Sequence, residues 1–146
     1  MTDAPVGVFI VDDHAVVRSG IAAYLEFIDD VTLVGEAADG EQALRQLAEL
    51  AARDSLPGVV LMDLVMPNMN GIEAMTAILA EFAEARVIIL TTFEGDVEIQ
   101  RALEAGARGY LLKSMPPKDL LDGIRQVHAG KKRIPPEIVA HLAEHL

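Results

Sequence analysis

The chain has 146 residues, of which 51% are hydrophobic, and this size and hydrophobic content fit a domain that buries its own core. It contains no cysteine, which excludes a disulfide framework, a thiolate metal site and a cysteine nucleophile. Its 23 acidic and 12 basic side chains give a net charge of −11, so we expect this segment to be repelled by nucleic acid phosphates.

Apolar runs alternate with segments of helical period from the N-terminus onward. The run from Val6 to Val11 predicts a strand, and an amphipathic helix follows it. Its apolar face carries Val17, Ile21, Leu25 and Ile28. The run from Val31 to Ala37 alternates apolar and polar residues less cleanly, so we place it at a sheet edge. The helix after it has an apolar face of Ala43, Leu44, Leu47 and Leu50.

A third apolar run, from Gly58 to Met62, leads through a Pro-Asn-Met-Asn-Gly loop into a further helix. Asn70 and Glu73 have the spacing of a capping box and predict where this helix begins. The helix carries Ile72, Met75, Leu79 and Phe82 at helical spacing.

Two more strand and helix pairs complete the pattern. The run from Val87 to Leu90 precedes a short helix that ends near Gly106. The run from Gly109 to Leu112 precedes a helix whose first turn suits Pro116 and Pro117. The inward face of that last helix carries Leu120, Leu121, Ile124 and Val127.

Five strands that alternate with five helices predict an α/β fold with one parallel sheet, covered by helices on both faces. We expect the doubly wound, flavodoxin-like (βα)5 arrangement with strand order 2-1-3-4-5. This domain should span residues 1–130. Residues 131–146 predict a linker with a short helix, in which the basic run Lys131-Lys132-Arg133 precedes Pro135-Pro136. The apolar positions of that tail helix are Ile138, Val139, Leu142 and Leu146.

Polar residues follow the predicted strands at their carboxyl ends, where an open parallel sheet binds its ligands. Asp12-Asp13 follow the first strand and Asp63 follows the third. Thr91-Thr92 follow the fourth and Lys113 follows the fifth. We therefore expect three carboxylates, a hydroxyl and an ammonium group to converge at one edge.

Clustered carboxylates repel one another unless one is protonated or a divalent cation binds between them. Mg²⁺ suits such a site, because it prefers oxygen ligands and is held by one or two carboxylates together with phosphate oxygens. Lys113 and Thr91 would then neutralise and donate to the oxygens of a phosphoryl group.

With these residues, the span from about Val6 to Gly130 resembles a response regulator receiver domain of two-component systems, close to the NarL/LuxR type. Asp12-Asp13 resemble the acidic metal-binding pair of that family, and Asp63 in Met-Asp-Leu-Val-Met-Pro resembles its phosphoacceptor. Thr91 resembles the switch hydroxyl, Lys113 in Gly-Tyr-Leu-Leu-Lys the family's lysine, and Tyr110 the aromatic switch residue.

The resemblance implies phosphoryl transfer from a sensor histidine kinase to Asp63. Mg²⁺ would be held by Asp13, Asp63 and the backbone carbonyl of Val65, with Asp12 acting through metal-bound water. The phosphoryl group would draw in the Thr91 hydroxyl, and Tyr110 would turn into the space so opened. This movement would change the surface of the fourth helix and fifth strand.

The family also implies a homodimer on activation, and DNA binding only through a helix-turn-helix domain after Leu146. The N-terminus lacks the features of a signal peptide, and no apolar run approaches the ~18 residues that span a bilayer. We therefore expect a cytoplasmic protein with no membrane contact. A stand-alone receiver, or a dimerisation module that works without phosphate, is the alternative.

Two positions depart from the family pattern. Ser114 stands where many receivers have a proline after the lysine, so the geometry of the Lys113–Ser114 bond stays open. Val65 and Phe93 lie two residues after Asp63 and Thr91, at family positions that flank the route of the hydrolytic water. Both are apolar and cannot orient a water molecule, which predicts a long-lived aspartyl phosphate.

Other interpretations of these residues fit less well. Asp12-Asp13 alone would suit a helix N-cap. A haloacid dehalogenase-like phosphatase needs a second acid where this chain has Val65. The segment His141-Leu-Ala-Glu144-His145 matches the H-x-x-E-H zinc signature, but it lies at the C-terminal end without a further ligand, so we interpret it as a solvated helix. His14 and His128 have no histidine or cysteine neighbour, and we interpret them as structural.

Overall fold

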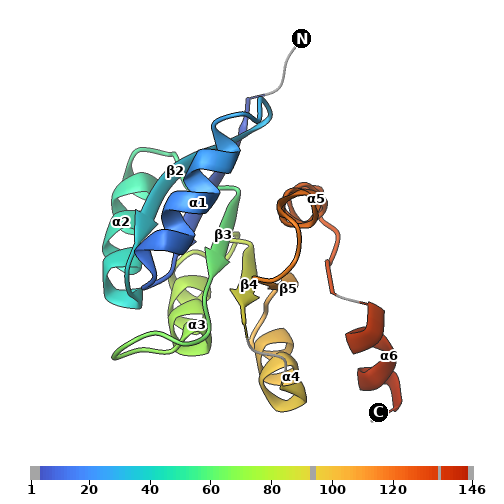
Figure 1. The fold of residues 1–146 in the computed structure, drawn as a ribbon. Coiled ribbons are helices and arrows are strands. Elements are labelled where there is room, and N and C mark those ends of the chain that lie inside the picture. The colour runs from blue at the N-terminus through green and yellow to red at the C-terminus, as the bar shows by residue number, and fades with distance from the viewer. Residues whose placement is uncertain (1–3, 93–94, 135, 145–146) are drawn as a thin grey trace.

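The computed structural model of the chain describes residues 4–92, 95–134 and 136–144. In this range five parallel strands form one sheet in the order β2-β1-β3-β4-β5, which confirms the predicted flavodoxin-like topology (Figure 1). The strands are β1 (Val6–Val11), β2 (Val31–Ala37), β3 (Val59–Met62), β4 (Val87–Thr91) and β5 (Gly109–Leu112). The helices are α1 (Ala15–Leu25), α2 (Gly40–Ala52), α3 (Gly71–Glu81), α4 (Asp96–Glu104), α5 (Pro117–His128) and α6 (Pro136–Glu144).

Helices cover both faces of the sheet. Successive residues of a strand point to opposite faces, so each strand contributes to both cores. Phe9 and Val11 of β1 belong to the core that α2, α3 and α4 cover. Val8 and Ile10 belong to the core that α1 and α5 cover. β3 is buried along its whole length, as a strand with helices on both faces must be.

β2 lies at the sheet edge, as its imperfect alternation predicts. Its pairing with β1 shifts register between Val8 and Phe9. Val8 is paired with Leu33, whereas Phe9 is paired with Gly35. The extra residue, Val34, is exposed. A β-carbon on Gly35 would lie 2.7 Å from the Phe9 ring, so this glycine makes room for the ring at the bulge.

Local signals fix where the helices begin. Asn70 caps α3 by accepting the Glu73 N–H at 2.9 Å, and Glu73 accepts the Asn70 N–H at 3.3 Å, which confirms the predicted capping box. Asp39 caps α2 by accepting the Gln42 N–H. Pro117 is the first residue of α5, where its missing N–H costs nothing.

The tail runs along the open edge of β5. Arg133 pairs with Gly109, and its backbone exchanges hydrogen bonds with Arg108 and Tyr110. α6 then contacts α4. The helix predicted within residues 131–146 is thus present and returns to the domain, although positions 135, 145 and 146 lie outside the described residues. No helix in the described ranges is long and apolar enough to cross a membrane.

Candidate functional site

The carboxyl ends of β1, β3 and β5 bring the predicted acids and the lysine together. The ladder hydrogen bonds continue one residue past each strand: the Asp63 N–H donates to Val11 at 3.0 Å, and the Lys113 N–H donates to Thr91 at 2.9 Å. Asp12 and Asp63 are only 2% and 3% exposed. The sheet therefore carries two buried carboxylates to the point where strand order reverses between β1 and β3.

Lys113 pairs with both buried acids. Its Nζ lies 2.7 Å from Asp12 Oδ2 and 3.2 Å from Asp63 Oδ2. Burial alone would lower the pKa of Lys113, but the hydrogen bond to Asp12 and the charges of the two acids together raise it. The lysine therefore stays an ammonium group at neutral pH and partly neutralises the site.

Asp63 lies in an environment that disfavours its negative charge. Burial raises the pKa of its carboxyl group; the charge of Lys113 opposes this shift, and the charge of Asp12 adds to it. A hydrogen bond from the Val65 backbone also stabilises the ionised form, but the net pKa remains above the usual range. One lysine does not fully compensate the buried acids, so the site favours a further positive charge.

His14, which the sequence analysis interprets as structural, also lies in this cluster. Its Nδ1 lies 3.0 Å from Asp12 Oδ1, 3.2 Å from Asp13 Oδ1 and 3.9 Å from Asp63 Oδ2. The N-cap residue of α1 is His14, and its side chain makes no cap hydrogen bond. Neither Asp12 nor Asp13 is therefore the N-cap residue of this helix. The only sequence signal was its position directly after Asp13.

The donor atoms suit a hard divalent cation. One ligand atom each from Asp12, Asp13, His14 and Asp63 lies within 4.8 Å of the others. Three of these donors are carboxylate oxygens, and Asp13, whose side chain is 33% exposed, leaves the cluster open to solvent. The residues present therefore fit a Mg²⁺ ion, which combines one or two carboxylates with water.

Gly71 holds the loop after β3 close to the helix that follows, and sequence reasoning did not single it out. Its N–H donates to the Leu64 carbonyl at 2.8 Å. A β-carbon at this position would lie 2.2 Å from the Asp63 carbonyl oxygen and 2.8 Å from Leu64 Cα. Only glycine lets the start of α3 approach the backbone of Asp63 this closely.

Of the other predicted site residues, Thr91 and Val65 lie at the carboxyl ends of the strands, and Tyr110 lies further back along β5. Thr91 is the last residue of β4 rather than the first after it, and it is fully buried. Tyr110 is also fully buried and belongs to the core that α4 covers. Val65 is 62% exposed, and Phe93 lies outside the described residues. The bond between Lys113 and Ser114 is trans.

The remaining histidine predictions concern His128 and the His141–His145 segment. His128 is exposed at the end of α5, where its carbonyl accepts a hydrogen bond from Arg86 at 3.1 Å. Of the His141–His145 segment, His145 lies outside the described residues, so the solvated-helix interpretation stays a prediction.

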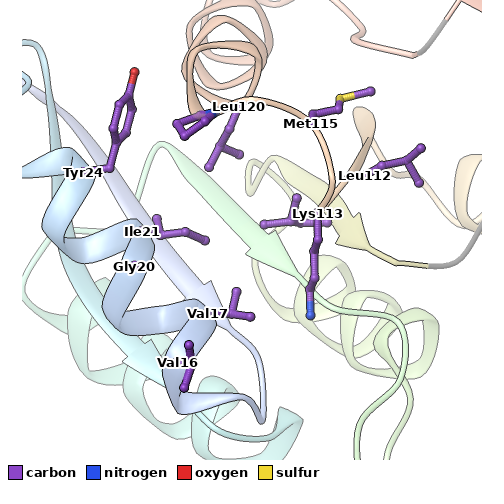
Figure 2. Close-up of a pocket in the computed structure, with 11 residues that line it drawn as sticks. Val16, Val17, Gly20, Ile21, Tyr24, Leu112, Lys113, Met115 and Leu120 are labelled. Carbon is purple, nitrogen blue, oxygen red and sulfur yellow. The ribbon is translucent and has the colours of Figure 1, made fainter.

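An apolar cavity of about 310 Å³ lies between α1 and α5, beside the acidic edge (Figure 2). Val17, Ile21 and Leu120 line it, and the stem of Lys113 forms part of its wall. Figure 2 shows the Lys113 amine pointing away from Leu120 and Met115. The amine pairs instead with Asp12 and Asp63.

The chain is similar to signalling proteins of known family. Residues 8–125 match the family described as the response regulator receiver domain. The response regulator protein VraR of Staphylococcus aureus is 38% identical over 139 residues, which cover 95% of this chain and 64% of VraR. The chain thus spans a little under two thirds of the length of this relative.

Solved structures agree with this similarity. A two-component response regulator of the LuxR family from Aurantimonas sp. SI85-9A1 superposes with a TM-score of 0.85 at 35% identity, covering 97% of this chain and 98% of that one. The isolated receiver domain of RcsB from Salmonella enterica serovar Typhimurium, solved with the phosphomimetic BeF3−, gives 0.81 at 29% identity, with coverages of 93% and 97%. Another RcsB structure contains two dimers bound to two parallel DNAs; it gives 0.82 at 29% identity, with coverages of 93% and 67%.

Proposed function

The chain belongs to the response regulator receiver family, and on this basis we propose that it accepts a phosphoryl group on Asp63 in a Mg²⁺-dependent reaction. One observation carries the proposal: the Lys113 ammonium lies within 3.2 Å of the Asp63 carboxylate at an edge that also gathers Asp12 and Asp13. Receivers are phosphoacceptor modules of signalling, and this arrangement provides the acceptor and the positive charge that the transfer needs.

We assign the metal ligands from the partners that each carboxylate already has. Both oxygens of Asp12 are engaged, Oδ1 by the N–H and ring of His14 and Oδ2 by Lys113. Asp12 would therefore act through metal-bound water, whereas Asp13, Asp63 and the backbone carbonyl of Val65 would bind Mg²⁺ directly. When bound, the ion supplies positive charge that offsets the charge developing on the transferred group.

The chain's own groups then position and stabilise the reacting atoms. A carboxylate oxygen of Asp63 attacks phosphorus, the P–O bond forms, and the P–N bond of the donor phosphohistidine breaks. Lys113 remains beside the phosphoryl oxygens as an ammonium group, and the Thr91 hydroxyl donates a hydrogen bond to one of them. The partner that supplies the phosphoryl group is a sensor histidine kinase.

We propose that the output surface is formed by α4 and β5. Thr91 ends β4, and β5 pairs with β4 so that Ile89 faces Tyr110. Tyr110 packs in the same core as Ile99 and Ala102 of α4. An inward shift of the Thr91 hydroxyl would change the packing of the Tyr110 ring, and through it the position of α4.

The whole protein's output is proposed from its relatives. VraR is longer than this chain, and RcsB has been solved as dimers bound to DNA. We propose that the receiver comprises residues 1–130, that residues 131–146 link it to a C-terminal helix-turn-helix domain, and that phosphorylation in the cytoplasm promotes a homodimer that binds DNA through that domain. A stand-alone receiver is the alternative.

Intact-mass measurement after incubation with acetyl phosphate and Mg²⁺ tests the central assignment. We expect one phosphate adduct on the wild type and on Asp29→Ala, an exposed acid outside the site, and none on Asp63→Ala. EDTA present during the incubation should prevent the adduct from forming on the wild type as well. An adduct on Asp63→Ala would refute the assignment, and no adduct on the wild type would favour a dimerisation module that works without phosphate.

We also propose that the aspartyl phosphate is long-lived. Val65 is exposed in the loop directly after the acceptor, and neither its side chain nor that of Phe93 can orient a hydrolytic water. Decay of the phosphorylated protein should be faster in Val65→Asn and in Phe93→Glu than in the wild type. Unchanged decay in both variants would remove the explanation.

A further inference from the structure

We propose that His14 is an additional ligand of the cation site, so that this receiver binds a late first-row transition metal ion of the Co²⁺, Ni²⁺ or Zn²⁺ class as well as Mg²⁺. The inference rests on the proposed function, because it concerns the same cluster of carboxylates. It goes further by assigning a nitrogen donor and a second class of metal ion to that cluster.

The position of the imidazole nitrogen fits a coordination site. Neighbouring ligands of an octahedral ion with bonds of about 2.1 Å lie about 3.0 Å apart, and opposite ligands about 4.2 Å apart. His14 Nδ1 lies 3.0 Å from Asp12 Oδ1 and 3.2 Å from Asp13 Oδ1, close to the spacing of neighbours. Its distance of 3.9 Å from Asp63 Oδ2 falls between the two values.

His14 and Lys113 approach Asp12 through different oxygens, and both lie near Asp63 Oδ2, at 3.9 Å and 3.2 Å. Lys113 contacts Oδ2 of Asp12 and Oδ2 of Asp63, whereas His14 contacts Oδ1 of Asp12 and Oδ1 of Asp13. A cation can therefore bind between His14 and Asp13 while Lys113 keeps its contact with Asp12. It would replace the contact between Nδ1 and Asp12, which would then reach the ion through metal-bound water.

The backbone keeps the ring at the cluster and open to a hydrated ion. The His14 N–H donates to Asp12 Oδ1 at 2.8 Å, which fixes the first residue before α1 against the acid. The imidazole side chain is 60% exposed, so an ion can reach Nδ1 from solvent without opening the core. The ring thus forms the outer wall of a site whose inner wall is Asp12 and Asp63.

The donor chemistry separates two classes of ion. Mg²⁺ takes oxygen ligands, so a nitrogen donor adds little to its affinity. Imidazole suits the later first-row ions, whose affinities also rise along the series towards copper. A nitrogen beside three carboxylates therefore raises affinity for Co²⁺ and Ni²⁺ more than for Mg²⁺.

Calorimetric titration of the whole chain with Co²⁺ and, separately, with Mg²⁺ tests the inference. We expect His14→Ala to lower the ratio of Co²⁺ affinity to Mg²⁺ affinity by about tenfold or more, since even outer-shell partners of a metal site contribute 10- to 100-fold. The visible absorption bands of bound Co²⁺ should also shift in this variant. His14→Gln, which keeps a polar side chain, should show the same loss.

Matched histidine variants act as controls. His128→Ala removes an exposed histidine from α5 and should leave the ratio unchanged. His141→Ala measures any Co²⁺ bound by the C-terminal H-x-x-E-H segment, and that binding should survive in His14→Ala.

The outcomes distinguish the two proposals. If Mg²⁺ binds and Asp63 is phosphorylated, but the Co²⁺ to Mg²⁺ ratio and the Co²⁺ spectrum are the same with and without His14, the inference is wrong and the proposed function stands. If neither ion binds in a way that Asp63→Asn and Asp13→Asn weaken, the proposed function fails together with the inference.

Discussion

Replacing Lys113 with methionine is the most direct test of the electrostatics of this site, because methionine keeps most of the length of the side chain and removes its charge. Lys113 Nζ lies 2.7 Å and 3.2 Å from the carboxylates of Asp12 and Asp63, which are 2% and 3% exposed. At an effective dielectric constant of ~20, each pair attracts by roughly 5 kcal/mol before desolvation is subtracted.

The net loss is smaller than this attraction, because removing the ammonium also removes its own desolvation penalty and lets Asp63 take up a proton. Breaking a buried ion pair from one side costs about 3–5 kcal/mol. We expect Lys113→Met to fall at the lower end, about 3 kcal/mol. For a domain of this size that corresponds to a melting temperature roughly 6–12 °C lower.

Urea unfolding at neutral pH and without divalent cations, followed by circular dichroism, measures this loss. Lys118→Met replaces an exposed lysine of α5 and should stay within about 0.5 kcal/mol of the wild type. Adding Asp63→Asn to Lys113→Met should recover much of the stability, since one of the two unpaired charges is gone. Millimolar Mg²⁺ should stabilise Lys113→Met more than the wild type, because the lysine no longer competes with the ion. A loss below about 1 kcal/mol, equal to the Lys118 control, would contradict the electrostatic account.

Three further predictions concern the acceptor and the loop that holds it. Because burial raises the pKa of Asp63, the unfolded chain releases this proton at lower pH than the folded chain, and stability falls as pH rises from the ordinary carboxyl pKa to the raised one. Asp63→Asn should abolish this part of the pH dependence and raise the urea midpoint at pH 7; an unchanged profile between pH 4 and pH 7 would argue against it. Gly71→Ala places a β-carbon 2.2 Å from the Asp63 carbonyl oxygen, so we expect a loss of about 3 kcal/mol and slower labelling by acetyl phosphate, whereas labelling at the wild-type rate would show that the loop can move. Asn70→Ala removes the cap of α3 and should cost about 1 kcal/mol in the same unfolding assay, with Asn70→Asp as the variant that retains the cap.

The fold was predictable because its signals are local and agree with one another. Each of the five apolar runs is long enough for a strand and short enough to exclude a helix, and each is followed by a segment of helical period. The capping box at Asn70 and the prolines at the start of α5 marked helix starts that the structure confirms. The handedness of parallel connections then leaves few topologies, so the strand order could be stated in advance.

The site was predictable only to the level of strand ends. Parallel strands bring their carboxyl ends to one edge, which sufficed to group Asp12, Asp63 and Lys113. The contact of His14 depends on the direction of one side chain at the start of α1, and no periodicity encodes that direction. The need for glycine at position 71 depends on the path of the loop after β3, which is set by tertiary packing.

The placement of Lys113 gives a physical reason why a change at Asp63 would alter the position of α4 as well as the acidic edge itself. The Lys113 N–H donates to the Thr91 carbonyl, so the lysine that pairs with the acceptor is also tied to the end of β4. Tyr110 lies three residues before Lys113, on β5 and inside the core that α4 covers, and α4 in turn contacts α6. Close-packed cores change between discrete arrangements rather than deforming continuously. If phosphorylation displaces Thr91, the Tyr110 ring and α4 must repack together, and the tail helix must follow α4 or lose its contact with it. Hydrogen exchange in α6 should therefore change on phosphorylation in the wild type and not in Thr91→Val. Equal protection of α6 in the phosphorylated and unphosphorylated wild type would show that the change does not pass from α4 to α6.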